Sequence, residues 1–126
     1  MTISIKTALR AVAAPGILLL ATACVQQPRP LYYWGGYQEQ VYDYFKNAGG
    51  GFEKQIIALE ADTEKARATG AQLPPGFHAH LGLLYAQVGK ENQVIQQLET
   101  EKTLYPESAK YMDFLIARYS GSGEKK

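Results

Sequence analysis

Residues 74–85, Pro-Pro-Gly-Phe-His-Ala-His-Leu-Gly-Leu-Leu-Tyr, contain the clearest helical signal in this chain of 126 residues. Apolar side chains recur at helical spacing from there on, so the pattern predicts a helix over residues 75–88 that ends at Gly89. A second helix is expected over residues 91–104, and Pro106 breaks the chain after it. The short connection favours packing of the two helices as an antiparallel hairpin.

The rest of the folded body has helical spacing as well. We expect further helices over residues 37–46, 51–69 and 107–119, and no run of residues alternates in the manner of a β-strand. The sequence therefore predicts an all-α domain over residues 31–119, built from consecutive short helical hairpins. We expect residues 120–126 to form a flexible, glycine-bearing tail.

The central hairpin resembles a tetratricopeptide repeat, in which small, large and turn residues occupy fixed places. The matching residues are Leu81, Gly82, Tyr85, Gly89, Leu98 and Pro106. A glycine at position 82 lets the two helices approach closely, and Tyr85 and Leu98 are expected to fill the gap between them. Pro106 sets the angle into the next helix. Because one repeat cannot bury its own apolar faces, the neighbouring helices must flank it.

Three positions depart from the repeat pattern. His78 stands in place of the usual Trp, and Val94 and Glu101 stand in place of small residues. We interpret Glu101 as a sign that the packing near it is looser or more exposed. An ordinary five-helix bundle with a chance match to the repeat is the alternative.

Cys24 is the only cysteine of the chain, and it follows a segment typical of secretion. Two basic residues precede an uncharged apolar run over residues 11–23, which ends in three small residues, Ala21-Thr22-Ala23. A cysteine directly after such residues is typical of a lipoprotein signal, in which the thiol takes the lipid and cleavage leaves the cysteine first. We therefore expect residues 1–23 to be a cleaved signal peptide and residues 24–30 to be a lipidated N-terminus with a proline-bearing tether.

Other interpretations of this segment are weaker. Residues 11–23 are too few for a transmembrane helix, since a span needs about 20. Cleavage by ordinary signal peptidase would leave a soluble periplasmic protein with an unpaired thiol, a liability in an oxidising compartment. A cysteine buried in a core is disfavoured by its position. Val25 is not the Asp that retains lipoproteins in the inner membrane of Gram-negative bacteria, so we expect acyl chains such as palmitate to anchor the protein to the periplasmic face of the outer membrane.

Composition excludes several classes of partner. Without residues 1–23, eleven Lys and Arg stand against twelve Asp and Glu, a formal charge of −1. Such a balance argues against nucleic acid as a partner and provides no polybasic patch for anionic lipid. A single cysteine allows neither a disulfide framework nor a thiolate zinc site.

The sequence contains no catalytic or metal-binding signature. His78 and His80, its only histidines, point about 200° apart on a helix, so they cannot share one metal. We expect His78 to pack against the preceding helix and His80 to face polar surroundings; a pH switch at His78 is the alternative. No serine has a base at a suggestive spacing, and Gly49–Gly51 lack the Gly-Lys-Ser/Thr of a phosphate loop. We therefore predict neither an enzyme nor a cofactor, metal or small-molecule substrate.

Aromatic residues crowd into the start of the folded body. Residues 32–45 include seven of them: Tyr32, Tyr33, Trp34, Tyr37, Tyr42, Tyr44 and Phe45. One interpretation is that they clamp the first helix onto the bundle. However, seven rings exceed what one face of a short helix can bury. The other interpretation is therefore that a protein partner docks through Trp34 and the adjacent tyrosines. The inner face of the repeat is a second candidate surface, and the candidate protein-binding residues are Tyr32, Tyr33, Trp34, Tyr37, His78 and Tyr85.

Three blocks, residues 31–37, 74–85 and 101–108, together resemble an uncharacterised family of small bacterial lipoproteins, domain of unknown function 4810. The resemblance implies a role beside a lipoprotein similar to the curli secretion pore subunit, in assembly or support of an outer-membrane complex. We thus expect a lipid-anchored, protein-binding accessory factor. The alternative is a purely structural envelope lipoprotein without a peptide-binding groove, and a periplasmic hydrolase or metal binder is disfavoured by the missing ligands.

Overall fold

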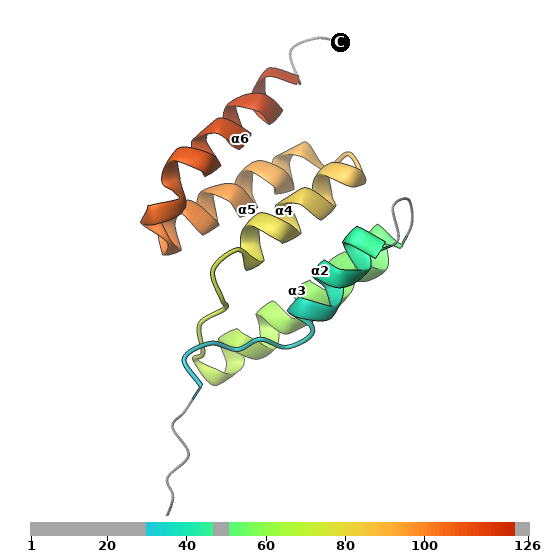
Figure 1. Ribbon diagram of the computed structural model, residues 1–126, viewed down its shortest axis with the longest axis vertical. Coiled ribbons are helices and arrows are strands. Elements are labelled where there is room, and N and C mark those ends of the chain that lie inside the picture. The colour runs from blue at the N-terminus through green and yellow to red at the C-terminus, as the bar shows by residue number, and fades with distance from the viewer. Residues whose placement is uncertain (1–29, 47–50, 123–126) are drawn as a thin grey trace, which may run out of the picture.

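The structure, a computed structural model, describes residues 30–46 and 51–122, and the named elements within these ranges are all helices (Figure 1). Its elements are α2 (Tyr37–Lys46), α3 (Phe52–Thr69), α4 (Phe77–Gln87), α5 (Glu91–Leu104), the 3₁₀ turn η2 (Pro106–Ser108) and α6 (Ala109–Ser122). In the described part, extended pairing is limited to a single bridge between Tyr32 and Gln72. The prediction of an all-α domain is confirmed. The signal peptide, Cys24 and most of the tether lie outside the described residues.

The helix boundaries follow the sequence pattern to within two residues, except at the C-terminal end; α3 begins one residue later than expected, and α4 spans residues 77–87 and not 75–88. Helices α2 and α5 have the expected bounds, whereas the residues after Pro106 first form η2 and only then α6. Helix α6 also continues to Ser122, past the expected end at residue 119. Gly121 costs an exposed helix only about 1 kcal/mol relative to Ala, so it does not stop the helix.

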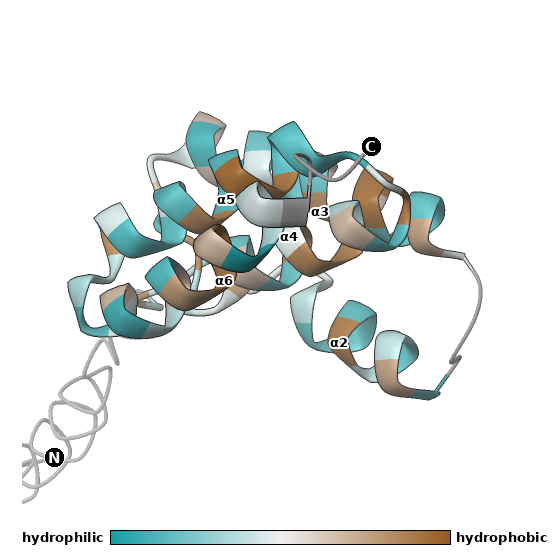
Figure 2. Ribbon diagram, turned by 90° about the horizontal axis from the view of Figure 1, so that it is seen from above, coloured by the Kyte–Doolittle hydropathy of each residue, from teal (hydrophilic) through white to brown (hydrophobic). Residues whose placement is uncertain are grey.

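The helices form two layers. Figures 1 and 2 show α2, α4 and α6 in the layer nearer the viewer of Figure 1, with α3 and α5 behind them. Helices α4 and α5 make the most extensive contact, and α6 and α3 pack on either side of this pair. The fully buried apolar residues lie between the layers and include Leu59, Phe77, Leu84, Val94 and Leu98.

Gly82 lies where α4 and α5 approach one another. A Cβ atom at this position would lie 3.4 Å from the Cβ of Gln97 and 3.5 Å from a methyl carbon of Leu98. The two helices therefore leave room for one methyl group at most, and a larger residue at position 82 would push them apart.

The carboxylate of Glu101 joins the N-terminus of α4 to α5. Its Oε1 accepts a hydrogen bond from the Gly76 N–H at 2.6 Å, and its Oε2 accepts from the N–H groups of His78 at 3.1 Å and Ala79 at 3.3 Å. The residue before α4 is Gly76, which has no side chain to cap the helix. Glu101 supplies this cap from another helix, and its negative charge lies at the positive end of the helix dipole.

The interpretation of Glu101 as a sign of loose or exposed packing is therefore wrong. The residue is only 2% exposed, and it is buried because three backbone donors replace the water that its carboxylate gives up.

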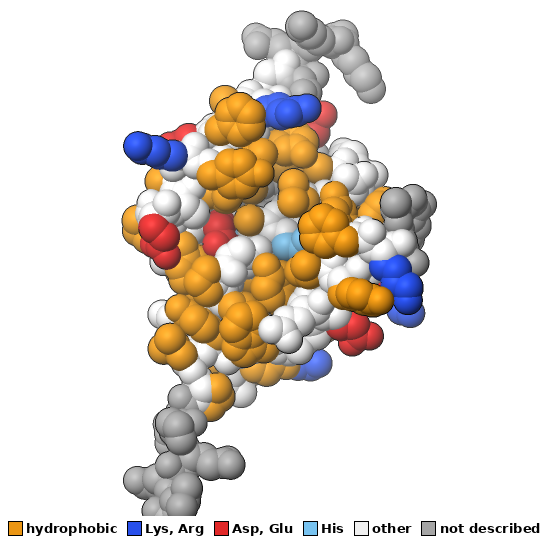
Figure 3. Space-filling view, viewed as in Figure 1, with side chains coloured by type: hydrophobic (Ala, Val, Ile, Leu, Met, Phe, Trp, Pro, Cys, Tyr) orange, Lys and Arg blue, Asp and Glu red, His pale blue; other side chains and the backbone are white. Residues whose placement is uncertain are grey.

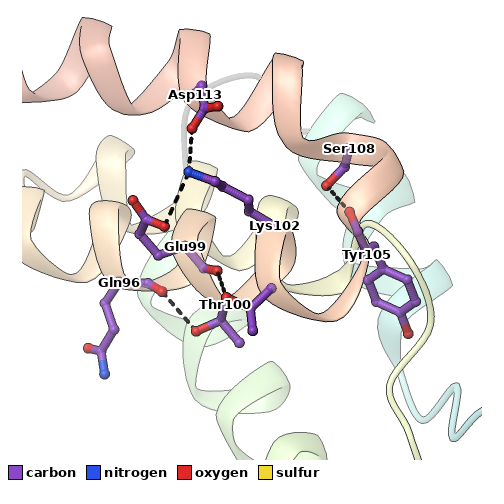
Figure 4. Close-up of polar contacts among 8 residues, drawn as sticks. Gln96, Glu99, Thr100, Lys102, Tyr105, Ser108 and Asp113 are labelled. Atoms are coloured by element: carbon purple, nitrogen blue, oxygen red, sulfur yellow. Dashed lines mark hydrogen bonds and ion pairs between the residues drawn. The ribbon is translucent and has the colours of Figure 1, made fainter.

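A polar link between α5 and α6 lies at the surface, in contrast to the buried carboxylate of Glu101 (Figure 4). The ammonium of Lys102 lies 2.6 Å from the Oδ1 of Asp113 and 3.7 Å from the Oε2 of Glu99. The hydrogen bond to Asp113 raises the pKa of Lys102. At the turn between the helices, the Ser108 hydroxyl donates to the carbonyl of Tyr105 at 2.7 Å and fixes the start of η2 beside Pro106.

The N-terminal segment is fastened to the back layer by its main chain. The N–H of Tyr33 donates to the carbonyl of Gln72 at 2.7 Å, and the N–H of Gly36 donates to Oδ2 of the buried Asp62 at 2.7 Å. Gly35 has φ of +45°, and an added Cβ would collide with the Asp62 carboxylate, so only glycine fits there.

Replacement of Glu101 by Ala should lower the free energy of unfolding by roughly 2–3 kcal/mol, because it leaves one buried and two partly buried N–H groups at the start of α4 without their acceptor. Urea denaturation measures this change. Glu99→Ala is the matched control on the same helix, since Glu99 is exposed, and it should change stability by about 0.5 kcal/mol or less. Equal losses in the two variants would contradict the capping role.

Candidate functional site

The outward side of α4 carries no charge. Residues 77–87 contain no Asp, Glu, Lys or Arg, and the side chains that the core leaves half-buried are Ala79, Leu83 and Ala86. Helix α3, in contrast, covers its outward side with charged residues. A half-exposed helix face without charges is unusual for a surface in contact with water alone, and such a face marks a candidate contact site.

Helix α6, which lies in the same layer as α4, carries two exposed aromatic rings. Tyr111 and Phe114 stack with ring centroids 6.4 Å apart and an interplanar angle of 16°, although they are 62% and 59% exposed. Figure 3 shows hydrophobic side chains gathered over the layer that α2, α4 and α6 form. We call the half-buried residues of α4 and the two rings of α6 together the apolar face; its members are Ala79, Leu83, Ala86, Tyr111 and Phe114.

Helix α2 borders the apolar face on its other side, and its aromatic residues divide into two groups. Tyr37 and Tyr44 turn inward: the Tyr37 ring lies 5.3 Å from that of Phe77, and the Tyr44 ring lies 6.0 Å from that of Phe52. The outward group, Tyr42 and Phe45, is 62% and 76% exposed. Part of the aromatic cluster thus clamps α2 onto the body, as one interpretation expected, and another part stays exposed.

Tyr32, Tyr33 and Trp34 lie where the N-terminal segment meets the loop between α3 and α4. Tyr33 is half-buried, with its hydroxyl 3.4 Å from Oδ1 of Asp62, and Tyr32 packs its ring against Trp34 and Tyr105. Trp34 is 45% exposed and stacks on Tyr37. Of the six predicted protein-binding residues, Trp34 is the only one classed as exposed.

His78 and Tyr85 both belong to the interior. His78 is buried, and its Nδ1 lies 2.7 Å from Oε1 of Gln97 on α5, so its polar contact is with the following helix and not the preceding one. The hydroxyl of Tyr85 donates to Glu60 on α3, and burial together with this hydrogen bond and charge raises its pKa to about 12. Neither side chain offers surface to a partner in this arrangement.

The expectation that His80 faces polar surroundings is wrong. His80 is 7% exposed and lies between the rings of Tyr37 and Tyr44, at centroid distances of 6.0 and 5.3 Å. Its Nε2 is buried without a hydrogen-bond partner. Burial lowers the pKa of the imidazole, and a hydrogen bond to the main chain of Gln40 opposes the shift only in part. His80 is therefore a neutral packing residue beneath α2.

A cavity of about 230 Å³ opens between the end of α3 and the start of α4. Its lining is mainly apolar and includes Ala66, Leu73 and Leu104, with Arg67 and His78 among its polar residues. Arg67 is already paired with Glu64, and His78 with Gln97. The two hydroxyls of the lining, those of Thr63 and Tyr105, donate to the main-chain carbonyls of Leu59 and Leu73. Within residues 30–46 and 51–122, no three His, Cys, Asp or Glu residues gather as metal ligands would.

The residues of the apolar face were missed at the level of sequence. Tyr111 and Phe114 are three residues apart and stand beside the buried stripe of Met112 and Leu115, which is the pattern of two rings on one flank of a helix. The absence of any charge over residues 77–87 is visible in the sequence as well, but periodicity alone attributes it to core packing.

The geometry defines a small all-α protein whose described helices offer an apolar contact surface. The model of the family described as Domain of unknown function (DUF4810) matches residues 31–115, and the chain belongs to this family. No curated protein and no solved structure matches the chain. Among the described residues, no helix combines the length and apolarity that a membrane crossing requires.

The buried His80 predicts a pH dependence of stability. As the pH falls below about 6.5, the unfolded chain takes up a proton on this imidazole that the folded chain accepts only at lower pH. The free energy of unfolding should therefore decrease as the pH falls through this range. His80→Phe keeps a ring between Tyr37 and Tyr44 and removes the titrating group. The free energy of unfolding of this variant should therefore depend less on pH than that of the parent chain.

Urea unfolding of both proteins on either side of pH 6.5 measures the difference. A variant as sensitive to pH as the parent chain would show that His80 makes no such contribution.

Proposed function

We propose that this protein is an outer-membrane lipoprotein, anchored at Cys24 to the periplasmic face, that binds other proteins as an accessory or assembly factor of an envelope complex. The signal-like segment before Cys24 supports the location. The family resemblance supports a curli-pore-like lipoprotein as a member of the complex. The function requires neither catalysis nor a cofactor.

The arrangement of the helices supports a tetratricopeptide-like module. Helices α4 and α5 form the hairpin whose residues resemble the repeat, with Gly82 at their close approach. In arrays of such hairpins the first helix of each pair lines the inner, concave surface, which these proteins use for binding. The common layer of α2, α4 and α6 supports a comparable role for these helices here (Figure 2).

The observation that carries the proposal is the apolar face. Exposed aromatic rings contribute strongly when a partner covers them, since each buries a large apolar area at little cost in side-chain entropy. Tyr111 and Phe114 are held in place by stacking on one another, and α4 contributes to the apolar face no charged side chain that would have to lose water on binding. The surface suits a partner segment with an uncharged, apolar side.

Acylation of Cys24 is the first test. The intact mass of the native protein should correspond to residues 24–126 with acyl chains attached. The Cys24→Ser variant should no longer be found in the membrane fraction. A native chain with a free thiol or with residues 1–23 still attached would contradict the proposed anchoring.

Cross-linking in whole cells tests the protein-binding role. Phe114→Ser should reduce capture of the partner about ten-fold, because loss of one aromatic anchor commonly costs about 1.4 kcal/mol or more. Ile57→Ser is the matched control, since Ile57 is a similarly exposed apolar residue on α3, and it should leave capture unchanged.

Circular dichroism of the purified variants confirms that both remain folded. Full capture by a folded Phe114→Ser variant would favour a structural lipoprotein without a discrete binding face.

A further inference from the structure

One end of the molecule combines exposed apolar side chains with a complete absence of charge. Residues 30–38 and 68–77 contain no Asp, Glu, Lys or Arg, although one in five residues of the chain is charged. The two segments lie side by side: the N–H of Tyr33 donates to the carbonyl of Gln72. Farther along, the Tyr37 hydroxyl lies beside Gly76. We call this surface the charge-free end.

Leu31 and Trp34 project from the charge-free end. Leu31 is 75% exposed and Trp34 is 45% exposed, while Tyr32 lies between them with its ring edge against Trp34. Around them, residues 68–72 are all exposed and uncharged. A leucine beside a tryptophan and a tyrosine is the composition that proteins place at a membrane interface, where amphipathic rings lie among the lipid headgroups.

Among the described residues, two charged groups next to this end are paired within the protein. Asp62 is buried beneath Gly36 and pairs with Lys65, and Arg67 pairs with Glu64 along α3. Glu107 stands at the margin, where its charge contributes to the raised pKa of Tyr105. Contact of residues 30–38 and 68–77 with lipid would therefore strip water from apolar and neutral polar groups, while the exposed carboxylate of Glu107 stays at the margin of the contact.

The length of chain before this end limits its distance from the anchor. Leu31 is seven residues after Cys24, so a fully extended chain could span at most about 25 Å between them. Figure 1 shows the N-terminal segment at one end of the longest axis and α6 at the other. An anchor at Cys24 thus holds the charge-free end within about 25 Å of the bilayer, whereas it sets no such limit on α6.

We propose that the charge-free end rests on the lipid surface, with Leu31 and Trp34 inserted among the headgroups of the leaflet that holds the anchor. This inference depends on the lipidation in the proposed function, and it adds a second contact with lipid that orients the domain. The layer of α2, α4 and α6 then runs away from the membrane, which leaves the apolar face open to a protein partner.

Trp34 is the only tryptophan of the chain, so its fluorescence reports directly on this contact. The acylated protein is reconstituted into vesicles of phosphatidylethanolamine with a minor share of phosphatidylglycerol, in which part of the lipid carries bromine on the acyl chain near the headgroup. Bromine quenches tryptophan only at short range. We expect quenching of roughly two-fold or more and a blue shift of the emission, as the indole enters the interface.

A double variant, Trp34→Phe with Phe114→Trp, is the matched control. It keeps the anchor and a single tryptophan but moves the fluorophore to the exposed side of α6, where brominated lipid should not quench it. Leu31→Glu should reduce quenching of Trp34 to near the control level, because it brings a charge to the interface. Phe114→Glu adds the same charge at the distant end and should leave the quenching intact.

The outcomes separate this inference from the proposed function. An acylated protein in which Trp34 and the tryptophan at position 114 are quenched to the same extent would overturn the oriented contact and leave the anchoring intact. Shielding of Trp34 only when a protein partner is present would assign this end to protein docking and overturn the lipid contact. A mass without acyl chains would overturn the proposed function and, with it, this inference.

Discussion

The three hydrogen bonds of the Glu101 carboxylate are the constraint on which the architecture depends. Helix α4 starts after a glycine in the left-handed region, with φ of +89°, and has neither a capping side chain nor an acidic residue in its first turn. A helix without charges or a cap of its own is a poor helix in water. Because α5 provides the acceptor, α4 can remain apolar on nearly every side. Its inward residues then fill the core, and its outward residues form the floor of the apolar face.

The same helix start also positions α2 and the N-terminal segment. The Tyr37 hydroxyl lies beside Gly76, and burial together with the charge of Glu101 raises the pKa of this phenol. From there the Tyr37 and Tyr44 rings extend over Phe77 and His80, so α2 is held by aromatic contacts even though none of its residues is fully buried. Asp62 fixes the segment before α2 from the opposite side, through the N–H of Gly36. A change at the start of α4 therefore acts on both the border of the apolar face and the charge-free end.

Helical periodicity predicts most of this fold, because each helix buries one stripe and the stripes are visible locally. It failed at Glu101 and His80, whose surroundings are set by residues far away in sequence. A glutamate on an amphipathic helix resembles any solvated acid until the turn at Gly76, twenty-five residues earlier, is brought against it. His80 lies on the half of α4 that would face water if α2 did not cover it. Similarly, the sequence indicated that aromatic residues near position 34 exceed what one helix can bury, but only the packing shows that Tyr33 and Tyr37 are taken up by the body and Trp34 is not.

The two uncharged surfaces lie on different parts of the molecule, and this separation bears on how an anchored domain could work. A flexible tether alone would let the domain turn freely, so a partner in the same membrane would meet the apolar face only in a fraction of orientations. Fixing orientation before encounter removes that entropic cost from the binding step. A second lipid contact at Leu31 and Trp34 has this effect, because two attachment points on a rigid body restrict its tilt. The apolar face, on the side of the long axis and extending toward α6, is then presented to proteins that stand in the same leaflet (Figure 1).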